Sequence, residues 1–262
     1  MAIIGIIGGS GLYEIQGLAL RQKEKIKTPF GNPSEDYIIG KFGDQDIIFL
    51  PRHGKNHNIP PHMINYRANI WGFKKLGVER ILSVSAVGGI KKGLKPRDVV
   101  VLDQVLDMTR NRESTFYDGK KGVVHIDFTE PYCPEMRKLL LKAGKLSKVH
   151  LKKGGTYVAV EGPRLESASE IKSFGILGGD VVGMTGMPEA ALARELEMCY
   201  SGLSVVANYA AGISKEKLTV QEVMEAMTIA TEKIKRLFRA AFPIIPDRRK
   251  CPCRVALKDA AV

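Results

Sequence analysis

The chain has 262 residues, 44% of them apolar, which is enough for one large domain with a substantial hydrophobic core. No apolar run approaches the roughly 20 residues of a membrane-spanning helix. The glycine-broken start of the chain also lacks the basic stretch and the small-residue cleavage site of a signal peptide. The composition therefore argues against a membrane protein and predicts a cytoplasmic one.

The net charge of +12 comes from 40 Lys and Arg against 28 Asp and Glu. Such an excess suits an anionic partner, yet the basic residues are dispersed and gather only at residues 138–153 and 248–254. Neither gathering contains the interleaved aromatic residues of a platform for single-stranded nucleic acid. We interpret most of the excess as solvated surface and expect no nucleic-acid partner.

Predicted strands and helices alternate along the whole chain. Strands are expected at residues 2–7, 37–41, 46–51, 81–86, 99–102, 156–160, 180–184 and 204–209, and helices at 62–76, 134–146, 168–174 and 188–197 and from Thr219 onward. The alternation predicts an α/β fold, with a single domain at residues 1–246 whose central mixed, largely parallel β-sheet is flanked by helices. Residues 247–262 are expected to form a C-terminal tail. The polar segment 103–131 is too long for a plain connection and is expected to be functional or to lie at an interface.

The four cysteines fall into two kinds. Cys133 and Cys199 stand alone in the sequence and are interpreted as buried thiols. Cys251 and Cys253 form a Cys-Pro-Cys motif that no Cys or His pair flanks, which disfavours a metal site. A disulfide within the pair or to another chain stays open, although a cytosolic location argues against it. We slightly prefer to interpret them as two tail thiols.

The first predicted strand ends in Gly8-Gly9-Ser10-Gly11, where backbone N–H groups can converge on an anion. The motif lacks the third glycine of a dinucleotide-binding loop, because Glu14 occupies that position. It also lacks the Gly-Lys-Ser/Thr of a P-loop. A bare phosphate therefore fits better than NAD or ATP.

Two further strands also end in motifs suited to an anion. Arg52 and His53 follow the strand that ends at Pro51, and an Arg side chain offers a fork of donors to phosphate oxygens. The segment 83–89 supplies hydroxyl and backbone donors from small residues. A structural histidine or a tight turn would explain each motif alone. Because sheets of this kind bind ligands beyond the carboxyl ends of their strands, the motifs together predict a phosphate site.

The order and spacing of these motifs resemble those of the trimer-forming purine nucleoside phosphorylases, and within them the methylthioadenosine phosphorylase branch. The resemblance spans residues 3 to about 246 and is carried by residues 4–12, 51–54, 65–71 and 161–164 and by Met184-Thr185-x-x-Pro188-Glu189. It implies that inorganic phosphate attacks C1′ of a ribonucleoside as co-substrate and releases a purine and a pentose 1-phosphate. No metal or organic cofactor is expected.

The resemblance also assigns roles to residues. The phosphate is expected to be surrounded by Gly9, Ser10, Arg52, His53, Ser85, Ala86 and Thr185. The nucleoside is expected to be bound by Leu165, Glu166, Gly183, Met184, Asn208, Ala210, Val220 and Val223, with His125 reaching in from a neighbouring subunit. Asn208, Glu166 and His53 are the expected catalytic residues. A homotrimer or a pair of trimers follows from the same resemblance.

Two departures from the branch concern the base. Asn208-Tyr209-Ala210 stands where methylthioadenosine phosphorylases carry Asp-x-Asp, and Leu165-Glu166 stands where they carry Phe-Ser. A carboxylate accepts a hydrogen bond from the N1–H of hypoxanthine and guanine, which adenine lacks, and an Asn amide can serve O6 and N7 of the same ring. Both changes therefore predict a 6-oxopurine.

The 5′ side departs from ordinary inosine phosphorylases, which offer a His to the 5′-hydroxyl. Val220 and Val223 would instead form an apolar wall suited to a methylthio group. The sequence thus predicts a methylthioinosine phosphorylase with some activity on inosine and guanosine. Three alternatives stay open: a preference for methylthioadenosine, a hydrolytic nucleosidase, and a basic protein that binds nucleic acid.

Overall fold

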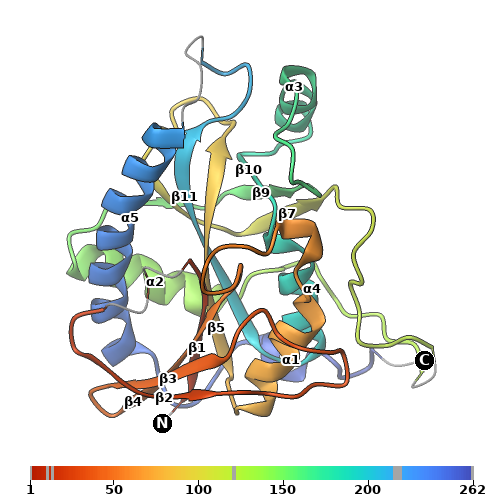
Figure 1. Ribbon diagram of the computed structural model, residues 1–262, viewed down its shortest axis with the longest axis vertical. Helices are drawn as coiled ribbons and strands as arrows, with labels where there is room; N and C mark the ends of the chain where they lie inside the picture. Colours follow the sequence, from red (N-terminus) through yellow and green to blue (C-terminus); the bar gives the residue numbers. More distant parts are fainter. Residues whose placement is uncertain (1, 10–11, 13–14, 120–121, 215–219, 261–262) are drawn as a thin grey trace.

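The computed structural model describes residues 2–9, 12, 15–119, 122–214 and 220–260, with their side chains except those at positions 220 and 222–224. One eleven-stranded sheet forms the centre of the molecule (Figure 1). Its strands are β1 (Ile4–Gly8), β2 (Leu18–Glu24), β3 (Tyr37–Phe42), β4 (Gln45–Pro51), β5 (Arg80–Gly89), β6 (Val99–Val101), β7 (Gln104–Asp107), β8 (Leu151–Lys153), β9 (Thr156–Ala159), β10 (Val181–Gly183) and β11 (Cys199–Tyr209).

The sheet forks at β5, which pairs with three strands. One path runs β2-β3-β4-β1-β5-β10-β9-β7, and a second leaves β5 through β11 to β6 and β8. Six strand pairs are parallel and four are antiparallel, so the predicted mixed, largely parallel sheet is confirmed. The long pairing of β5 with β11 forms the central ribbon in Figure 1.

Helices cover both faces of this sheet. They are α1 (Tyr66–Lys75), α2 (Pro134–Leu146), α3 (Ala168–Ile176), α4 (Gly186–Glu195) and α5 (Val220–Ala241), with short 3-10 turns η2 (Pro61–Met63), η3 (Phe242–Ile244) and η4 (Pro252–Val255). Figure 1 shows α2 and α5 on one side and α1 and α4 on the other. Two apolar clusters reflect this division, one packed around α1 and α4 and the other around α2 and α5.

The predicted elements are confirmed with shifted boundaries at several ends. The helix predicted at 62–76 is divided, because the Asn65 side chain accepts the backbone N–H of Ala68 and caps a helix that starts at Tyr66. Three strands were not predicted. β2 is an edge strand with mostly exposed side chains and therefore shows no alternation, and β7 and β8 are only four and three residues long. The predicted helix start at Thr219 lies outside the described residues.

The segment after residue 246 packs onto the body. Arg80 donates from Nη2 to the carbonyl oxygen of Pro246 (2.6 Å), and Arg249 donates to the carbonyl oxygen of Glu197 (2.5 Å). The side chains of Cys251 and Cys253 are only 5% and 1% exposed. Their interpretation as tail thiols is therefore wrong, because this segment packs into the apolar cluster around α2 and α5.

The cysteines that stand alone in the sequence are not alone in the fold. Cys133 and Cys199 are fully buried, as predicted, and their sulfur atoms lie beside those of the Cys-Pro-Cys motif. The sequence argument that no second pair flanks the motif is therefore wrong in space.

In the part of the chain that the structure describes, no helix is long and apolar enough to cross a membrane.

Candidate active site

A cavity of about 780 Å³ opens where β1, β4, β5, β10 and β11 end or approach their ends. This volume suits a small organic ligand together with a phosphate ion. The predicted site residues that line it are Gly9, Arg52, His53, Ser85, Ala86, Leu165, Glu166, Gly183, Met184, Thr185, Asn208 and Ala210. The motifs predicted to meet at one edge of the sheet therefore do so.

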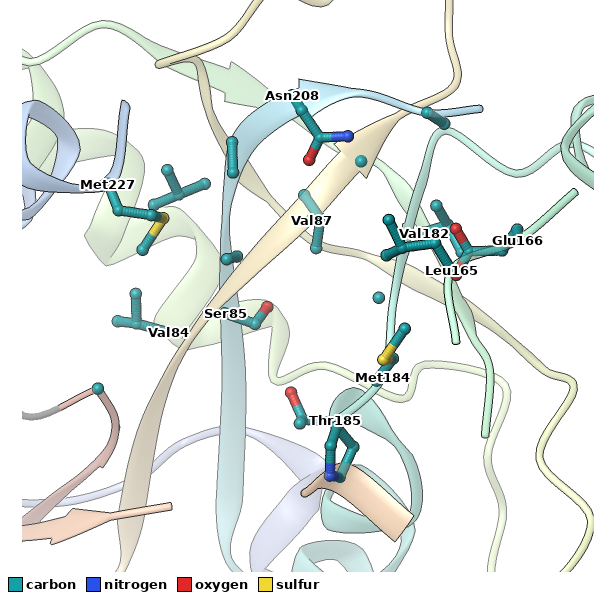
Figure 2. A pocket seen from close by; sticks show the side chains of 18 of the residues that line it. Val84, Ser85, Val87, Leu165, Glu166, Val182, Met184, Thr185, Asn208 and Met227 are labelled. Atoms are coloured by element: carbon teal, nitrogen blue, oxygen red, sulfur yellow. The ribbon is translucent and has the colours of Figure 1, made fainter. Parts of the chain in front are cut away.

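Two groups of polar side chains face each other across this cavity (Figure 2). The hydroxyls of Ser85 and Thr185 lie at one end, and Asn208 and Glu166 lie at the other, with Met184 between them. A bulge in β11 between Val206 and Asn208 shifts the pairing with β5 just before Asn208. Bulges of this kind redirect a side chain, which accounts for an Asn at the cavity wall in an otherwise buried strand.

Arg52 is buried at the end of the cavity that holds Ser85 and Thr185, and most of its N–H groups donate to the protein itself. Its Nε donates to Glu189 Oε1 (2.5 Å), and its Nη2 donates to Ser83 Oγ (2.7 Å) and Glu189 Oε2 (3.1 Å). Its Nη1 donates to the carbonyl oxygen of Val84 (2.9 Å). Within the described chain this leaves a single Nη1–H without a partner. The buried pair with Glu189 thus fixes the guanidinium and balances its charge, so Arg52 can offer the cavity one donor.

His53 is neutral at pH 7. Burial, together with the positive charge of Arg52, lowers the pKa of His53 to about 4. Its Nδ1 lies 2.9 Å from the carbonyl oxygen of Ile59, so Nδ1 carries the proton and donates. The other ring nitrogen, Nε2, is then an acceptor. His53 can therefore take a hydrogen bond or a proton from a ligand hydroxyl but cannot donate to an anion.

The opposite end of the cavity combines one carboxylate and one amide. Glu166 is half-buried, and burial raises the pKa of its carboxyl. Asn208 lies at the wall, and its Nδ2 donates to the carbonyl oxygen of Tyr209 (2.6 Å). Leu165 is 61% exposed at the rim. A ring bound here would meet acceptors on Glu166 and an adaptable amide on Asn208.

Arg112 is a supporting residue that sequence reasoning missed. Its Nη1 donates to the carbonyl oxygens of Met184 (2.7 Å) and Met187 (2.5 Å), and its Nη2 donates to that of Glu161 (2.8 Å). Its guanidinium also lies 5.0 Å from the centre of the Tyr66 ring. Arg112 thereby ties the Met184 segment to the Glu161 segment, which leads to Leu165 and Glu166. A lone Arg in a polar loop carries no periodic signal that could have identified it.

The chain matches the model of the phosphorylase superfamily over residues 3–243. It belongs to this superfamily. It is 53% identical over 266 residues to a 6-oxopurine nucleoside phosphorylase from Pyrococcus furiosus, with 99% of both chains covered. It is also 45% identical to an S-methyl-5′-thioadenosine phosphorylase from Thermofilum pendens, with 99% of this chain and 98% of the relative covered. The resemblance inferred from the motifs is confirmed.

The fold of this phosphorylase agrees with the same relationship. A crystal structure of a methylthioadenosine phosphorylase sourced from an antarctic soil metagenomic library superposes with a TM-score of 0.93 at 36% identity, covering 100% of this chain and 92% of that one. The named relatives differ in the purine they act on, so family membership leaves the base to be argued from the site.

The other four predicted site residues are Ser10, His125, Val220 and Val223. Ser10 lies outside the described residues, as do the side chains of Val220 and Val223. His125 is exposed, away from the cavity of its own chain, and its backbone N–H donates to the carbonyl oxygen of Ala260 (2.8 Å). Its predicted role in a neighbouring subunit stays a prediction. Met227, Thr231 and Ile234 of α5 line the cavity on the side where the apolar wall was expected.

Proposed function

We propose that this phosphorylase cleaves 5′-methylthioinosine with inorganic phosphate, releasing hypoxanthine and 5-methylthioribose 1-phosphate. Inosine and guanosine are slower substrates of the same site, and the reaction belongs to purine salvage in the cytoplasm. The observation that carries the proposal is that Glu166 and Asn208 line one cavity with the phosphate motifs. The ligands are small molecules, and catalysis uses no metal or organic cofactor.

The end of the cavity that holds Ser85 and Thr185 is the proposed phosphate end, and it supports attack by phosphate dianion. Ser85 and Thr185 offer hydroxyl donors, and Arg52, whose charge Glu189 balances, adds one N–H donor. Neutral His53 accepts the remaining phosphate O–H, which keeps electron density on the attacking oxygen. The anion then stabilises the oxocarbenium character that develops on the sugar as the glycosidic bond breaks. Prearranged groups of this kind lower a barrier without reorganising during the reaction.

The base end supports departure of a 6-oxopurine. The Glu166 carboxylate accepts N1–H, and the Asn208 amide bonds O6 and N7 where negative charge develops. Removing one donor of this type costs about 100- to 1,000-fold in rate. Arg112 supports both walls by fixing the carbonyl of Met184 and the start of the Glu161 segment.

The protonation of Glu166 gives a test in pH. Its raised pKa means that the carboxylate is lost at a higher pH than for an ordinary Glu, whose pKa is about 4.3. The ionised form accepts N1–H more strongly than the protonated form, so kcat/KM for inosine is expected to fall as the pH drops through the raised pKa. Glu166→Gln should flatten this acid limb. The profile is measured at constant phosphate dianion, and an unchanged limb in the variant would contradict the assignment.

The 5′ group can be tested on α5. Met227 lines the cavity, whereas Ile229 on the same helix is 41% exposed and does not. Met227→His offers a partner to a 5′-hydroxyl, and a buried hydroxyl without one costs about 1–3 kcal/mol, so the preference should shift roughly tenfold toward inosine. Ile229→His is the matched control and should leave the ratio of kcat/KM values for methylthioinosine and inosine unchanged. Equal ratios in both variants would show that the 5′ pocket lies elsewhere.

A homo-oligomer, a trimer or a pair of trimers, is part of this proposal because His125 lies outside the cavity of its own chain. His125→Ala should raise KM for 5′-substituted nucleosides without changing the melting temperature. Val123→Ala is a control, since Val123 is an exposed side chain of the same segment. Sedimentation at assay concentration measures the assembly. A fully active monomer would rule out a shared site.

The main rival keeps the reaction and prefers methylthioadenosine, as does the 45% identical relative by its name. Glu166 opposes it, because adenine presents a lone pair at N1 and two acceptors would then face each other. Cleavage assays on methylthioinosine, methylthioadenosine, inosine and adenosine, each with and without phosphate, distinguish the rival from the proposal and both from a hydrolase.

A further inference from the structure

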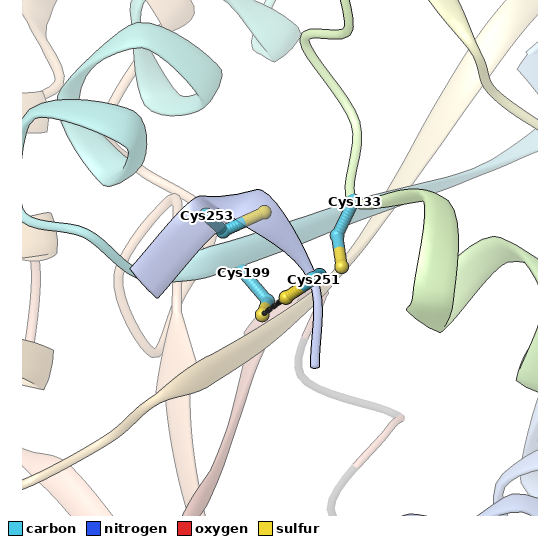
Figure 3. A group of neighbouring side chains, drawn as sticks. All are labelled: Cys133, Cys199, Cys251 and Cys253. Carbon is cyan, nitrogen blue, oxygen red and sulfur yellow. Dashed lines mark hydrogen bonds between the residues drawn. The ribbon is translucent and has the colours of Figure 1, made fainter. Parts of the chain in front are cut away.

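All four cysteines of the chain meet in one buried cluster, although they come from three separate segments of the sequence. Cys133 caps the start of α2, Cys199 opens β11, and Cys251 and Cys253 flank the first residue of η4 (Figure 3). Their sulfur atoms all lie within 4.8 Å of one another, and all four side chains are buried. Structural zinc sites use four cysteine ligands around one ion, although their paired cysteines usually have two to four residues between them and here Pro252 alone separates the pair.

Two groups beside the cluster can stabilise negative charge on its sulfur atoms. The backbone N–H of Met136, in the first turn of α2, donates to Cys133 Sγ (3.5 Å), and a helix N-terminus stabilises negative charge. The guanidinium of the buried Arg194 also lies near Cys253. Negative charge on the sulfur atoms therefore has partners already in place.

We propose that Cys133, Cys199, Cys251 and Cys253 form a tetrathiolate site for a soft divalent cation, with Zn²⁺ as the ion. A zinc–sulfur bond of about 2.3 Å in tetrahedral geometry places neighbouring sulfurs about 3.8 Å apart. The sulfurs of Cys199 and Cys251 are 3.2 Å apart, and the other separations stay within 4.8 Å. Small movements of the side chains would bring all four sulfur atoms onto one ion. Two disulfides would instead require the sulfur atoms to approach one another only in pairs.

The binding step balances without an oxidant or reductant. One Zn²⁺ and four thiols form four zinc–sulfur bonds and release four protons, which leaves a centre of charge −2. Arg194 lies beside it, and its guanidinium also donates to the carbonyl oxygen of Glu130. The chain as a whole carries 40 Lys and Arg against 28 Asp and Glu, so its net positive charge does not oppose a centre of charge −2.

The role of the site is structural. Cys199 is the first residue of β11 and Asn208 is near its end, which at about 3.3 Å per residue puts the cluster about 30 Å from the base end of the cavity. The ion would join the C-terminal segment to α2 and β11. That segment continues to Ala260, which accepts a hydrogen bond from the His125 backbone.

The first experiment measures metal and thiols in the native protein. The full chain is produced with added zinc, purified without chelator and analysed for metals, intact mass and thiols released on denaturation. We expect a single zinc per chain and four thiols that react only after the metal is removed. A metal-free protein whose mass is lower by four hydrogens would show two disulfides and overturn the proposal. A metal-free protein with four free thiols would overturn it equally.

The second experiment compares variants. Cys253→Ser should lose at least about tenfold in bound zinc and melt at a lower temperature, whereas Pro252→Ala, which changes the same loop and keeps every thiol, should retain the ion. Replacing zinc by Co²⁺ in the native protein should give the intense visible absorption of a tetrahedral cobalt thiolate. If Cys253→Ser does not fold, the metal content and the cobalt spectrum of the native protein still decide, and zinc retained by a folded Cys253→Ser would contradict the four-ligand site.

Discussion

We expect kcat/KM for methylthioinosine to exceed that for methylthioadenosine by at least about a hundredfold, because a site with matched buried hydrogen-bonding groups can reject a mismatched ligand by up to about 10⁴-fold. The difference arises at Glu166, which lies in the cavity wall and needs a donor at N1. Asn208 can rotate its amide to suit either ring, so Glu166 should carry most of the discrimination. Comparable values for the two nucleosides would contradict the base assignment.

Substitutions in the same wall test the cause of this preference. Glu166→Ser combined with Asn208→Asp and Ala210→Asp should move the preference toward adenine nucleosides. Glu166→Gln keeps the shape of the side chain but can accept or donate, so it should lose most of the discrimination while retaining activity. A ratio that stays unchanged in both variants would place the base elsewhere in the cavity.

The second large effect is a complete requirement for phosphate. In phosphate-free buffer we expect no product, because the hydroxyls of Ser85 and Thr185 and the acceptor on His53 are arranged for an oxyanion carrying a proton. The sugar product with phosphate should be a pentose 1-phosphate. Equal rates without phosphate, with free pentose as product, would indicate a hydrolase.

The same assay separates the active site from the cysteine cluster. Brief addition of EDTA should leave the initial rate unchanged, since the proposed ion lies about 30 Å along β11 from the base end. Added divalent cations should likewise have no effect. A rate that requires an added cation would contradict a metal-free catalytic step.

The sequence predicted the cavity well because its residues follow strand ends. Gly9, Arg52 and Thr185 each follow the end of a strand by one or two residues, which brings them to one edge of the sheet. Arg112 escaped prediction because its role depends on carbonyl groups from distant segments, which no local pattern encodes. The cysteine cluster escaped for the same reason: its two pairs become neighbours only when the C-terminal segment folds back under β11.

The Arg52–Glu189 pair shows a further limit of motif reasoning. An Arg at a strand end is typical of phosphate binding, and the sequence assigned it that role. In the structure most of its donors bind Glu189, Ser83 and Val84. Its contact with phosphate stays a prediction, and the sequence could not show that α4 would supply a buried carboxylate to it.

The pairing of β5 with β11 has a consequence for how the molecule is made. Arg80 lies opposite Cys199, so these strands join residues separated by 119 positions. Non-local parallel pairing is slow to form, and a nascent chain that ends before β11 exposes one edge of β5. The wall carrying Asn208 is therefore added late in synthesis, because β11 begins only at residue 199 of 262, and until then that edge of β5 stays open to pairing with other strands.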